Sequence, residues 1–368
     1  MNILITGATG FLGREIVFHE LSVEPDAHLT LLIRGKDEAD ARARGDAVLA
    51  DGLKGDALEA AKTRVTVIRS DLEQERFGLD EARYDALAEK ITHVIHGAAS
   101  VSFTLPVEEA RAINVEGTRR ILDFAKKAGA RTDYIGTAYV AGERIGLALE
   151  SDLDVGQTFR NTYEQTKMEA EKLVRERAKS QPIAIFRPSI IVGDSTTGRT
   201  SSFKVLYWPL KMFARGFGVV VPGREDTRVD IVPSDYVVRA IGHIRKDPAS
   251  AGQTYHLAAG PERSATLGDL TTLASKFFRV RRPWFVSPSK FTKYARPLID
   301  RFAFGKARYV LLTARVYTPY LSIQLLFDTS TTRAALKGTD IAVPPVNEYF
   351  TTLFQYAVES DWGKKTAE

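Results

Sequence analysis

The chain opens with NILITGATGFLG at positions 2–13, a short apolar run followed by a glycine-rich loop. The run 2–6 has the length of a buried strand, and residues 11–21 continue as a helical pattern. Between them the glycines stand at the spacing Gly7-x-x-Gly10-x-x-Gly13. This spacing is a weak signal alone, but a strand before it and a helix after it make it useful. The stretch predicts the first unit of a parallel sheet that binds a dinucleotide.

The three glycines of this loop have separate physical roles. Gly7 permits a tight turn, Gly10 lets the backbone approach a pyrophosphate, and Gly13 permits close packing of the helix. The phosphates then face the free N–H groups at the helix N-terminus. A glycine-rich turn without a ligand is the alternative. The residues of this loop expected to bind the cofactor are Gly7, Thr9, Gly10, Phe11, Leu12, Gly13 and Arg14.

Short apolar runs alternate with longer helical patterns through the first two-thirds of the chain. Besides 2–6, the expected strands cover 28–34, 65–69, 93–96, 133–136 and 183–186. The expected helical segments are an alanine- and charge-rich stretch to about residue 58, a helix over 114–127, and a helix that carries Tyr163 and Lys167. This alternation predicts an α/β protein with a doubly wound parallel (Rossmann) sheet. In such sheets ligands bind beyond the carboxyl ends of the strands.

The pattern changes after about residue 195. We expect residues 1–195 to form the dinucleotide-binding domain, with later strands returning from about 225–260. Residues 196–368 are expected to form a smaller C-terminal α/β lobe that binds the substrate. Ser234-Asp235 is a helix-start signal for 236–244, whereas the aromatic and basic stretch 279–327 predicts no definite structure.

The end of the second predicted strand indicates which dinucleotide is bound. The segment LLIRGK at 31–36 contains no Asp or Glu, the residue that accepts from the ribose 2′-hydroxyl in an NAD site. Arg34 instead suits the extra 2′-phosphate of NADP, and Arg14 adds a second cation. NADPH is therefore the expected cofactor. The alternative is that Arg34 is an ordinary surface residue.

Two further strand ends carry residues suited to a dinucleotide. Asp71 follows the strand 65–69, where its carboxylate can accept from the adenine amino group while Leu72 packs on the ring. Ala98 and Ala99 belong to the run GAAS at 97–100, whose small side chains let a dinucleotide pass close to the backbone. Each feature alone also fits an ordinary turn, and their order along the chain makes them jointly informative.

Tyr163 and Lys167 stand four residues apart in NTYEQTK at 161–167. On a helix this spacing puts both side chains on one face, and an ammonium beside a phenol lowers the phenol pKa from about 10 toward neutrality. Such a phenol is suited to give a proton to a carbonyl that receives a hydride. Thr137, just past the strand 133–136, has a hydroxyl placed to hydrogen-bond the same carbonyl oxygen.

Together these features resemble the extended short-chain dehydrogenase/reductase superfamily over roughly residues 1–260. The resemblance implies that Tyr163 is the catalytic acid/base, that Lys167 lowers its pKa and holds the nicotinamide ribose, and that Thr137 takes the usual Ser/Thr position. It also implies that Pro188, Ser189 and Ile190 pass the nicotinamide amide, and that Asn114 organises the site.

Finer strings are similar to the fatty acyl-CoA reductase and thioester reductase branch of that superfamily. They are HGAASVSF at 96–103, NVEGT at 114–118, TAYVAG at 137–142 and DIVP at 230–233. The similarity implies NADPH-dependent reduction of an acyl thioester, carried by CoA or an acyl carrier protein, or of a fatty aldehyde. The chain lacks the adenylation and carrier domains of multidomain carboxylic acid reductases. After residue 260 the similarity is limited to a few short strings.

Composition excludes several other classes of protein. The chain has 368 residues and no cysteine, so disulfides, thiolate metal sites and a cysteine nucleophile are excluded; this fits a cytoplasmic protein. Its six histidines show no metal-ligand spacing. The lysines and arginines responsible for its net charge of +5 are scattered along the chain, whereas a nucleic-acid-binding protein would cluster them on one face. No apolar run reaches eighteen residues, so no spanning helix is expected. Met1 stands directly before the first strand, which leaves no room for a signal peptide.

Several alternatives remain open on the sequence. The aromatic residues of 203–217 either line a tunnel for an acyl chain or form the core of the second lobe. The stretch 291–327 either contacts a membrane surface or a phosphopantetheine arm, or is a solvated cover. The same catalytic residues also suit a nucleotide-sugar or a hydroxysteroid substrate. A catalytically silent NADP-sensing or scaffold protein would not need Thr137, Tyr163 and Lys167 together.

Overall fold

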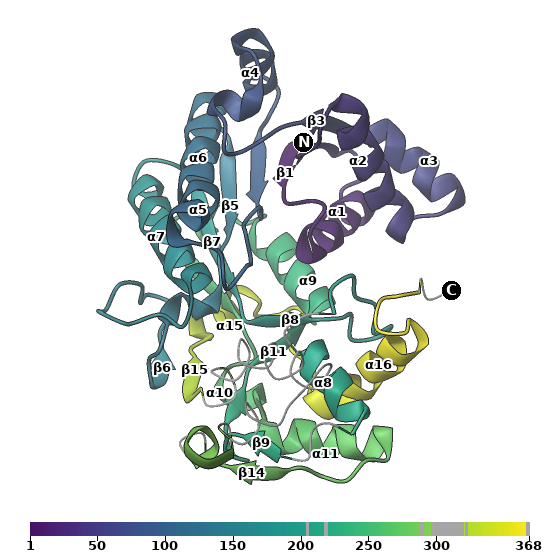
Figure 1. Ribbon diagram of the computed structural model, residues 1–368. Helices are drawn as coiled ribbons and strands as arrows, with labels where there is room; N and C mark the ends of the chain where they lie inside the picture. Colours follow the sequence, from purple (N-terminus) through teal and green to yellow (C-terminus); the bar gives the residue numbers. More distant parts are fainter. Residues whose placement is uncertain are drawn as a thin grey trace.

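A seven-stranded parallel sheet forms the centre of the protein (Figure 1). The computed structural model describes residues 1–203, 206–216, 220–287, 290–295, 297, 320 and 323–365. The strand order is β12-β7-β5-β4-β1-β2-β3, and all neighbouring pairs are parallel. The strands are β1 (Asn2–Thr6), β2 (His28–Ile33), β3 (Val65–Arg69), β4 (His93–His96), β5 (Arg131–Ile135), β7 (Ile183–Pro188) and β12 (Thr254–Leu257). This order confirms the predicted doubly wound α/β fold.

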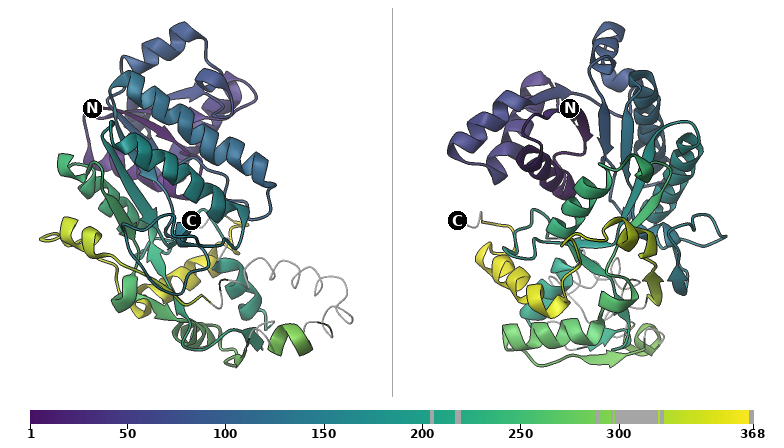
Figure 2. Two further views of the ribbon diagram at one scale, coloured as in Figure 1. Left: turned by 90° about the vertical axis from the view of Figure 1, so that its left-hand side faces the viewer. Right: turned by 180° about the vertical axis from the view of Figure 1, so that it is seen from behind.

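Helices cover both faces of the sheet (Figures 1 and 2). One face carries α1 (Phe11–Val23), α2 (Glu38–Gly52), α3 (Gly55–Arg64) and α9 (Ser234–Ile244). The other carries α4 (Glu81–Ala88), α5 (Val107–Arg111), the π-helix η2 (Ala112–Glu116), α6 (Gly117–Ala128) and α7 (Thr162–Ala178). Short 3-10 turns lie at η1 (Glu75–Gly78), η3 (Ala138–Ala141) and η4 (Pro248–Ser250).

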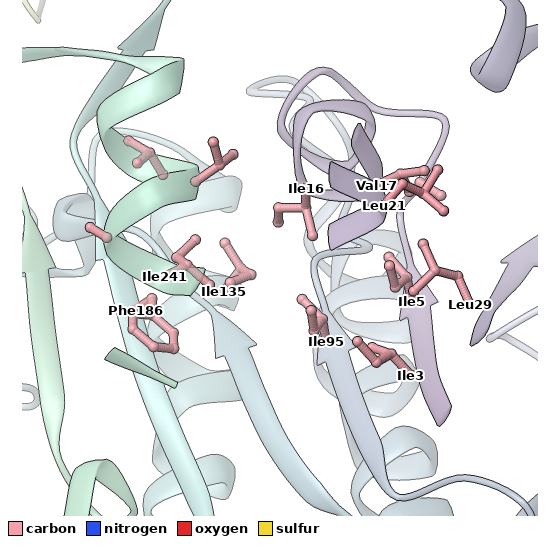
Figure 3. Close-up of a cluster of buried hydrophobic side chains, with 14 of the residues drawn as sticks. Ile3, Ile5, Ile16, Val17, Leu21, Leu29, Ile95, Ile135, Phe186 and Ile241 are labelled. Carbon is pink, nitrogen blue, oxygen red and sulfur yellow. The ribbon is translucent and has the colours of Figure 1, made fainter. Parts of the chain in front are cut away.

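The apolar core is divided by the sheet. In β1, Ile3 and Ile5 point toward α1, whereas Leu4 points to the opposite face, because successive strand side chains alternate between faces. Figure 3 shows Ile3 and Ile5 in one apolar cluster with Ile16 and Val17 of α1. Both faces are buried, so strands such as β1, β2 and β7 are mostly apolar on both sides.

A second apolar core lies beyond the sheet, among α8 (Tyr207–Ala214), α11 (Leu267–Phe278) and α16 (Val346–Glu359). Outside the central sheet the described residues form four two-stranded pairs, two of which contribute side chains to this core. They are β8 (Ile190–Val192) with β11 (Ile231–Pro233), β9 (Val220–Pro222) with β14 (Trp284–Val286), β10 (Arg228–Val229) with β13 (Ala265–Thr266), and β6 (Gly146–Ala148) with β15 (Leu325–Phe327). The remaining helices described are α10 (Gly260–Arg263), the π-helix η5 (Phe291–Ala295) and α15 (Ser330–Ala335). The chain returns to the central sheet at β12, while the boundary at residue 195 stays a prediction.

Some local expectations differ from the structure. The helical stretch expected to end near residue 58 is two helices, because the backbone is extended at Leu53 and Lys54 and restarts at Gly55, whose φ is +55°. On α8, Tyr207, Leu210 and Phe213 are buried in the second core, which favours a core over an acyl tunnel for these residues. Much of the stretch 279–327, including residues 298–319, lies outside the described residues.

Candidate active site

The predicted site residues follow the ends of the parallel strands β1 to β5 and β7, or lie on η2 and α7. The carboxyl ends of these strands form the ligand-binding edge of a doubly wound sheet. At the end of β1, Gly7 has φ +78°, and a Cβ there would lie 2.7 Å from the Ala98 nitrogen. A Cβ at Gly13 would lie 2.1 Å from the Gly7 oxygen. Neither position tolerates a side chain, so the loop stays a bare backbone cradle.

The cradle leaves donors free for an anion. Gly10 donates its N–H to the Gly7 oxygen at 2.8 Å and closes the turn. Gly10 is also the N-cap of α1, where no side chain caps the helix and the first turn holds no acidic residue. The N–H groups of this first turn therefore face outward with the positive end of the helix dipole, as a pyrophosphate requires. The residues present fit a dinucleotide.

Two arginines predicted to bind the cofactor, Arg34 and Arg14, differ in how strongly other groups of the protein hold their side chains. Arg34, just past β2, keeps 71% of its side chain exposed and forms a loose ion pair with Glu73 at 3.6 Å. Arg14 is more engaged, since it donates to the Thr9 carbonyl at 3.3 Å and to Asp51 at 3.0 Å. Arg34 is therefore the freer of the two for a phosphate.

The loops after β3 and β4 are held by their own hydrogen bonds. Asp71 accepts from the Glu73 N–H at 3.0 Å, and Leu72 packs beside Gly117 at the start of α6. After β4, the Ala98 N–H donates to the Thr6 hydroxyl at 3.1 Å. Ala98 and Ala99 thus lie next to the glycine loop, where small side chains leave room for a dinucleotide.

Asn114 joins the loop after β4 to helix α7. It is buried in the π-helix η2, a form often found at functional sites. Its side-chain oxygen accepts from the Ser100 N–H at 2.7 Å, and its amide donates to the Ser100 carbonyl at 3.2 Å and to the Thr166 hydroxyl at 2.9 Å. Asn114 therefore sets the distance between this loop and the helix of Tyr163.

Tyr163 and Thr137 face each other across the site. Asn161 caps α7 by accepting from the Glu164 N–H at 3.0 Å, which places Tyr163 in the first turn. Burial raises the pKa of Tyr163 to about 12, a side-chain hydrogen bond with Thr137 opposes that rise, and the nearby charge of Glu164 adds to it. The Thr137 hydroxyl also donates to the Pro188 carbonyl at 3.5 Å, so the end of β7 adjoins the same point.

Lys167 lies one turn after Tyr163, with its ammonium directed at β5. Its Nζ donates to the Ile135 carbonyl at 2.9 Å and lies 4.5 Å from the centre of the Tyr134 ring. Burial lowers the pKa of Lys167 to about 8, against a smaller upward effect of Glu171. The expected lowering of the Tyr163 pKa by Lys167 is wrong in this structure, because the ammonium interacts with Ile135 and Tyr134 and the phenol is buried.

Pro188 ends β7, Ser189 follows it and Ile190 begins β8, so the segment expected near the nicotinamide joins these two strands. The Ser189 N–H donates to the Leu257 carbonyl of β12 at 3.1 Å. Ile190 begins β8, which pairs with Ile231 of β11. The segment is therefore fixed on both sides by neighbouring strands.

An aromatic group that was not predicted lies beside Tyr163. The Phe103 ring is 6.0 Å from the ring of Tyr163 and stacks on Tyr320 at 5.6 Å, while Tyr139 meets Tyr320 edge to face. The Tyr320 hydroxyl donates to Glu164 at 2.7 Å and accepts from Asn161 at 2.8 Å. Glu164 has a local signal in the sequence, since Asn161 and Glu164 match a capping box, but Tyr320 has none.

A buried polar network behind the site was also missed. The Arg187 guanidinium at the end of β7 pairs with Glu171 of α7 at 2.7 Å, and both are almost fully buried. Arg187 also contacts the His256 ring of β12 at 3.0 Å, and the backbone N–H of His256 donates to the Glu150 carboxylate at 2.9 Å. Glu150 in turn accepts from the first N–H groups of α15. These charges join β7, β12, α7 and α15 behind the catalytic residues.

Metal and membrane features were searched over the described ranges. Within them no cluster of three or more His, Cys, Asp or Glu side chains is arranged to hold a metal ion. None of the helices described combines the length and apolar character needed to cross a bilayer.

Comparison with known proteins places this site in a family. Residues 5–241 match the family model described as male sterility protein. The chain is 32% identical over 269 residues to the glycine betaine reductase ATRR of Emericella nidulans, covering 69% of this chain and 21% of that protein. It is 28% identical over 272 residues to the fatty acyl-CoA reductase wat of Drosophila melanogaster, covering 65% of this chain and 53% of that protein. The chain thus spans about a fifth of the length of the first relative and about half of the length of the second.

A solved structure is similar over almost the whole chain. The terminal R domain from the myxalamid PKS-NRPS biosynthetic pathway superposes with a TM-score of 0.84 at 28% identity. The match covers 99% of this chain and 92% of that domain. The likeness therefore includes the part after residue 260, where the sequence similarity was thin.

Proposed function

Because the chain belongs to the male sterility protein family of extended short-chain dehydrogenases/reductases, we propose that it is an NADPH-dependent reductase of an acyl thioester or a fatty aldehyde. The family assignment makes it an oxidoreductase with a nicotinamide cofactor. The observation that carries the finer proposal is the meeting of Thr137 and Tyr163 beside the bare glycine cradle.

In the proposed reaction the cofactor supplies a hydride to the carbonyl carbon. The hydroxyls of Thr137 and Tyr163 hydrogen-bond the carbonyl oxygen, where negative charge develops. Tyr163 then gives its proton to that oxygen. From a thioester this forms a hemithioacetal, whose carbon–sulfur bond breaks to release a thiol and leave an aldehyde.

The protonation state of Tyr163 suits this direction. A phenol with a pKa of about 12 carries its proton at neutral pH. Reduction needs a proton donor at this position, so no prior ionisation is required. Lys167 acts next to it as a buried cation, and its place beside Ile135 supports the backbone that leads into Thr137.

The preference for NADPH rests on Arg34. Its guanidinium follows β2, the position at which a dinucleotide site reads the adenosine ribose. An exposed arginine there suits a 2′-phosphate, and the Glu73 carboxylate, at 3.6 Å, holds it only loosely.

The substrate class rests on the aromatic group beside Tyr163. Phe103, Tyr139 and Tyr320 offer apolar ring faces, which favour an acyl chain over a sugar. The thiol carrier would be CoA or the phosphopantetheine arm of a carrier protein, since both present the same thioester chemistry.

The test is a cofactor-oxidation assay with the purified chain. NADPH and NADH are each offered with acyl-CoAs, acyl carrier protein thioesters, fatty aldehydes, a UDP-sugar and a hydroxysteroid. We expect NADPH consumption with a thioester or fatty aldehyde, lost in Tyr163→Phe. Turnover of the UDP-sugar or hydroxysteroid alone would refute the proposed substrate class.

A further inference from the structure

His96 is a buried histidine that the proposed chemistry does not use. It ends β4 and is 2% exposed. Its Nδ1 lies 2.7 Å from the Thr6 hydroxyl, and its Nε2 lies 3.0 Å from the Thr118 hydroxyl. Thr6 directly precedes the first glycine of the dinucleotide loop, and Thr118 lies in the first turn of α6.

The neighbouring hydrogen bonds determine which ring nitrogen carries the proton. The Thr118 hydroxyl donates its own proton to the Asn114 carbonyl at 2.7 Å, so its oxygen accepts from His96 Nε2–H. Nδ1 is then the bare nitrogen and accepts the Thr6 proton. The Thr6 oxygen is left to accept from the Ala98 N–H at 3.1 Å. The opposite tautomer would leave the Thr6 proton without an acceptor among the hydrogen bonds described.

The charge state of the ring agrees with this assignment. Burial and the nearby charge of Lys167 lower the pKa of His96 to about 3. The ring is therefore neutral at every pH at which the protein would work, with one donor and one acceptor nitrogen.

The resulting chain of hydrogen bonds connects the parts that would hold the cofactor. It runs from the Ala98 N–H through Thr6, His96 and Thr118 to the Asn114 carbonyl. Ala98 lies in the loop after β4, and Thr6 precedes the glycine cradle, whose Gly7 approaches Gly97 too closely to admit a Cβ. The Asn114 side chain extends the connection to Ser100 and to Thr166 of α7.

We propose that His96, as the neutral Nε2–H tautomer, is a positioning residue that fixes the loops after β1 and β4 against each other for dinucleotide binding. The inference rests on the proposed function only in taking those loops as the dinucleotide site. The backbone bond from the Gly97 N–H to the Thr6 carbonyl would remain. Loss of the Thr6 link to His96 would therefore loosen the two loops, and the dinucleotide would then have to order them.

The first test is the tautomer itself. In the full chain labelled with ¹⁵N-histidine, long-range proton–nitrogen correlations distinguish the two neutral tautomers and the cation, and the missing signal of His96→Gln identifies this ring among the six histidines. We expect a neutral Nε2–H pattern unchanged from pH 6 to 8. An Nδ1–H pattern, or titration within that range, would overturn the assignment, whatever the enzyme's substrate proves to be.

The second test separates the two ends of the ring. In His96→Asn the side-chain oxygen falls near the Nδ1 position and can still accept from Thr6. In His96→Gln the amide falls near Nε2 and keeps only the Thr118 link. We expect His96→Gln to weaken NADPH binding, measured by nucleotide fluorescence, about tenfold, and His96→Asn to weaken it less, with kcat at saturating NADPH nearly unchanged in both.

A matched control lies on the same strand. His93 starts β4 at its opposite end, far along the strand from the dinucleotide loops, and His93→Gln should leave NADPH affinity unchanged. Wild-type affinity in His96→Gln, or equal losses in the His93 and His96 variants, would overturn the positioning role. The positioning role would also be overturned if His96→Gln lowered the Tm but left the NADPH affinity unchanged.

Discussion

Lys167 gives a prediction in which stability and activity move in opposite directions with pH. Lys167 is 3% exposed, and its ammonium contacts the Ile135 carbonyl and the Tyr134 ring. Burial lowers its pKa from 10.5 to about 8. In the unfolded chain the same group keeps its ordinary pKa, so folding is linked to proton release in this interval.

The sign and size of the stability effect follow from that difference. Below pH 8 both states carry the ammonium, and the buried charge destabilises the fold. Between pH 8 and 10.5 the unfolded chain binds a proton that the folded chain does not, so the free energy of unfolding rises with pH. At about 1.4 kcal/mol for each pH unit, the gain over this interval is about 3 kcal/mol. Lys167→Met should lack this gain.

The assay is urea unfolding of wild type and Lys167→Met at several values from pH 7 to 10.5. Because the other groups titrate in both proteins, the difference between the two free energies isolates Lys167. This difference in free energy of unfolding should change by about 3 kcal/mol in favour of the wild type as pH rises from 8 to 10.5. Lys172→Met, an exposed lysine on the same helix paired with Asp154 at 2.6 Å, is the matched control and should follow the wild type.

Activity should fall over the same range. If the cationic form of Lys167 supports catalysis, kcat declines above pH 8, well before Tyr163 would ionise. If the difference in free energy of unfolding between the wild type and Lys167→Met stayed constant with pH, the assignment of a buried charge to Lys167 would be refuted. A kcat that holds up to pH 10 would instead show that the charge of Lys167 is not needed.

Three other substitutions test separate parts of the site. Tyr163→Phe removes the proton donor and should lower turnover by about 10²- to 10⁴-fold, with NADPH affinity retained; normal turnover would remove Tyr163 from its role. Arg34→Ala should raise the KM for NADPH about tenfold and leave that for NADH unchanged; equal effects on both would contradict contact with the 2′-phosphate. Tyr320→Phe loses the hydrogen bonds to Glu164 and Asn161, so Tm should fall and the KM for the acyl substrate should rise; a lower Tm with the same KM would make Tyr320 only structural.

The central fold could be predicted from the sequence because its signals are local. The strand, glycine loop and helix of residues 2–21 require a close approach of backbones, and the structure has that approach at Gly7 and Gly13. Short apolar runs marked six of the seven central strands. The seventh, β12, has the sequence TYHL and follows β7 only after the second lobe has intervened, so neither its residues nor its place in the alternation marked it as a strand.

The sequence could predict site residues that directly follow a strand end. It could not predict the surroundings or pKa of a residue whose contacts come from distant parts of the chain. Thr137 meets Tyr163, and Asn114 meets Thr166 on the same helix, because the segments that carry Thr137 and Asn114 follow the neighbouring strands β5 and β4. The environment of Lys167 depends on Tyr134 and Ile135 of β5, and no spacing within α7 reveals it. Tyr320 stands 156 residues from Glu164 along the chain, so only the folded chain brings the two together.

The electrostatics of Tyr163 and Lys167 bear on the direction of the reaction. A phenol with a pKa of about 12 is ionised in only about one molecule in 10⁵ at pH 7. Oxidation of an alcohol would need that rare phenolate as a base, whereas reduction uses the phenol that is already present. The nearby charge of Glu164 opposes ionisation further, and the Lys167 ammonium lies against Ile135 and Tyr134 and does not offset it. The same burial that made the predicted pKa shift wrong therefore keeps Tyr163 protonated, the form that reduction of a carbonyl uses.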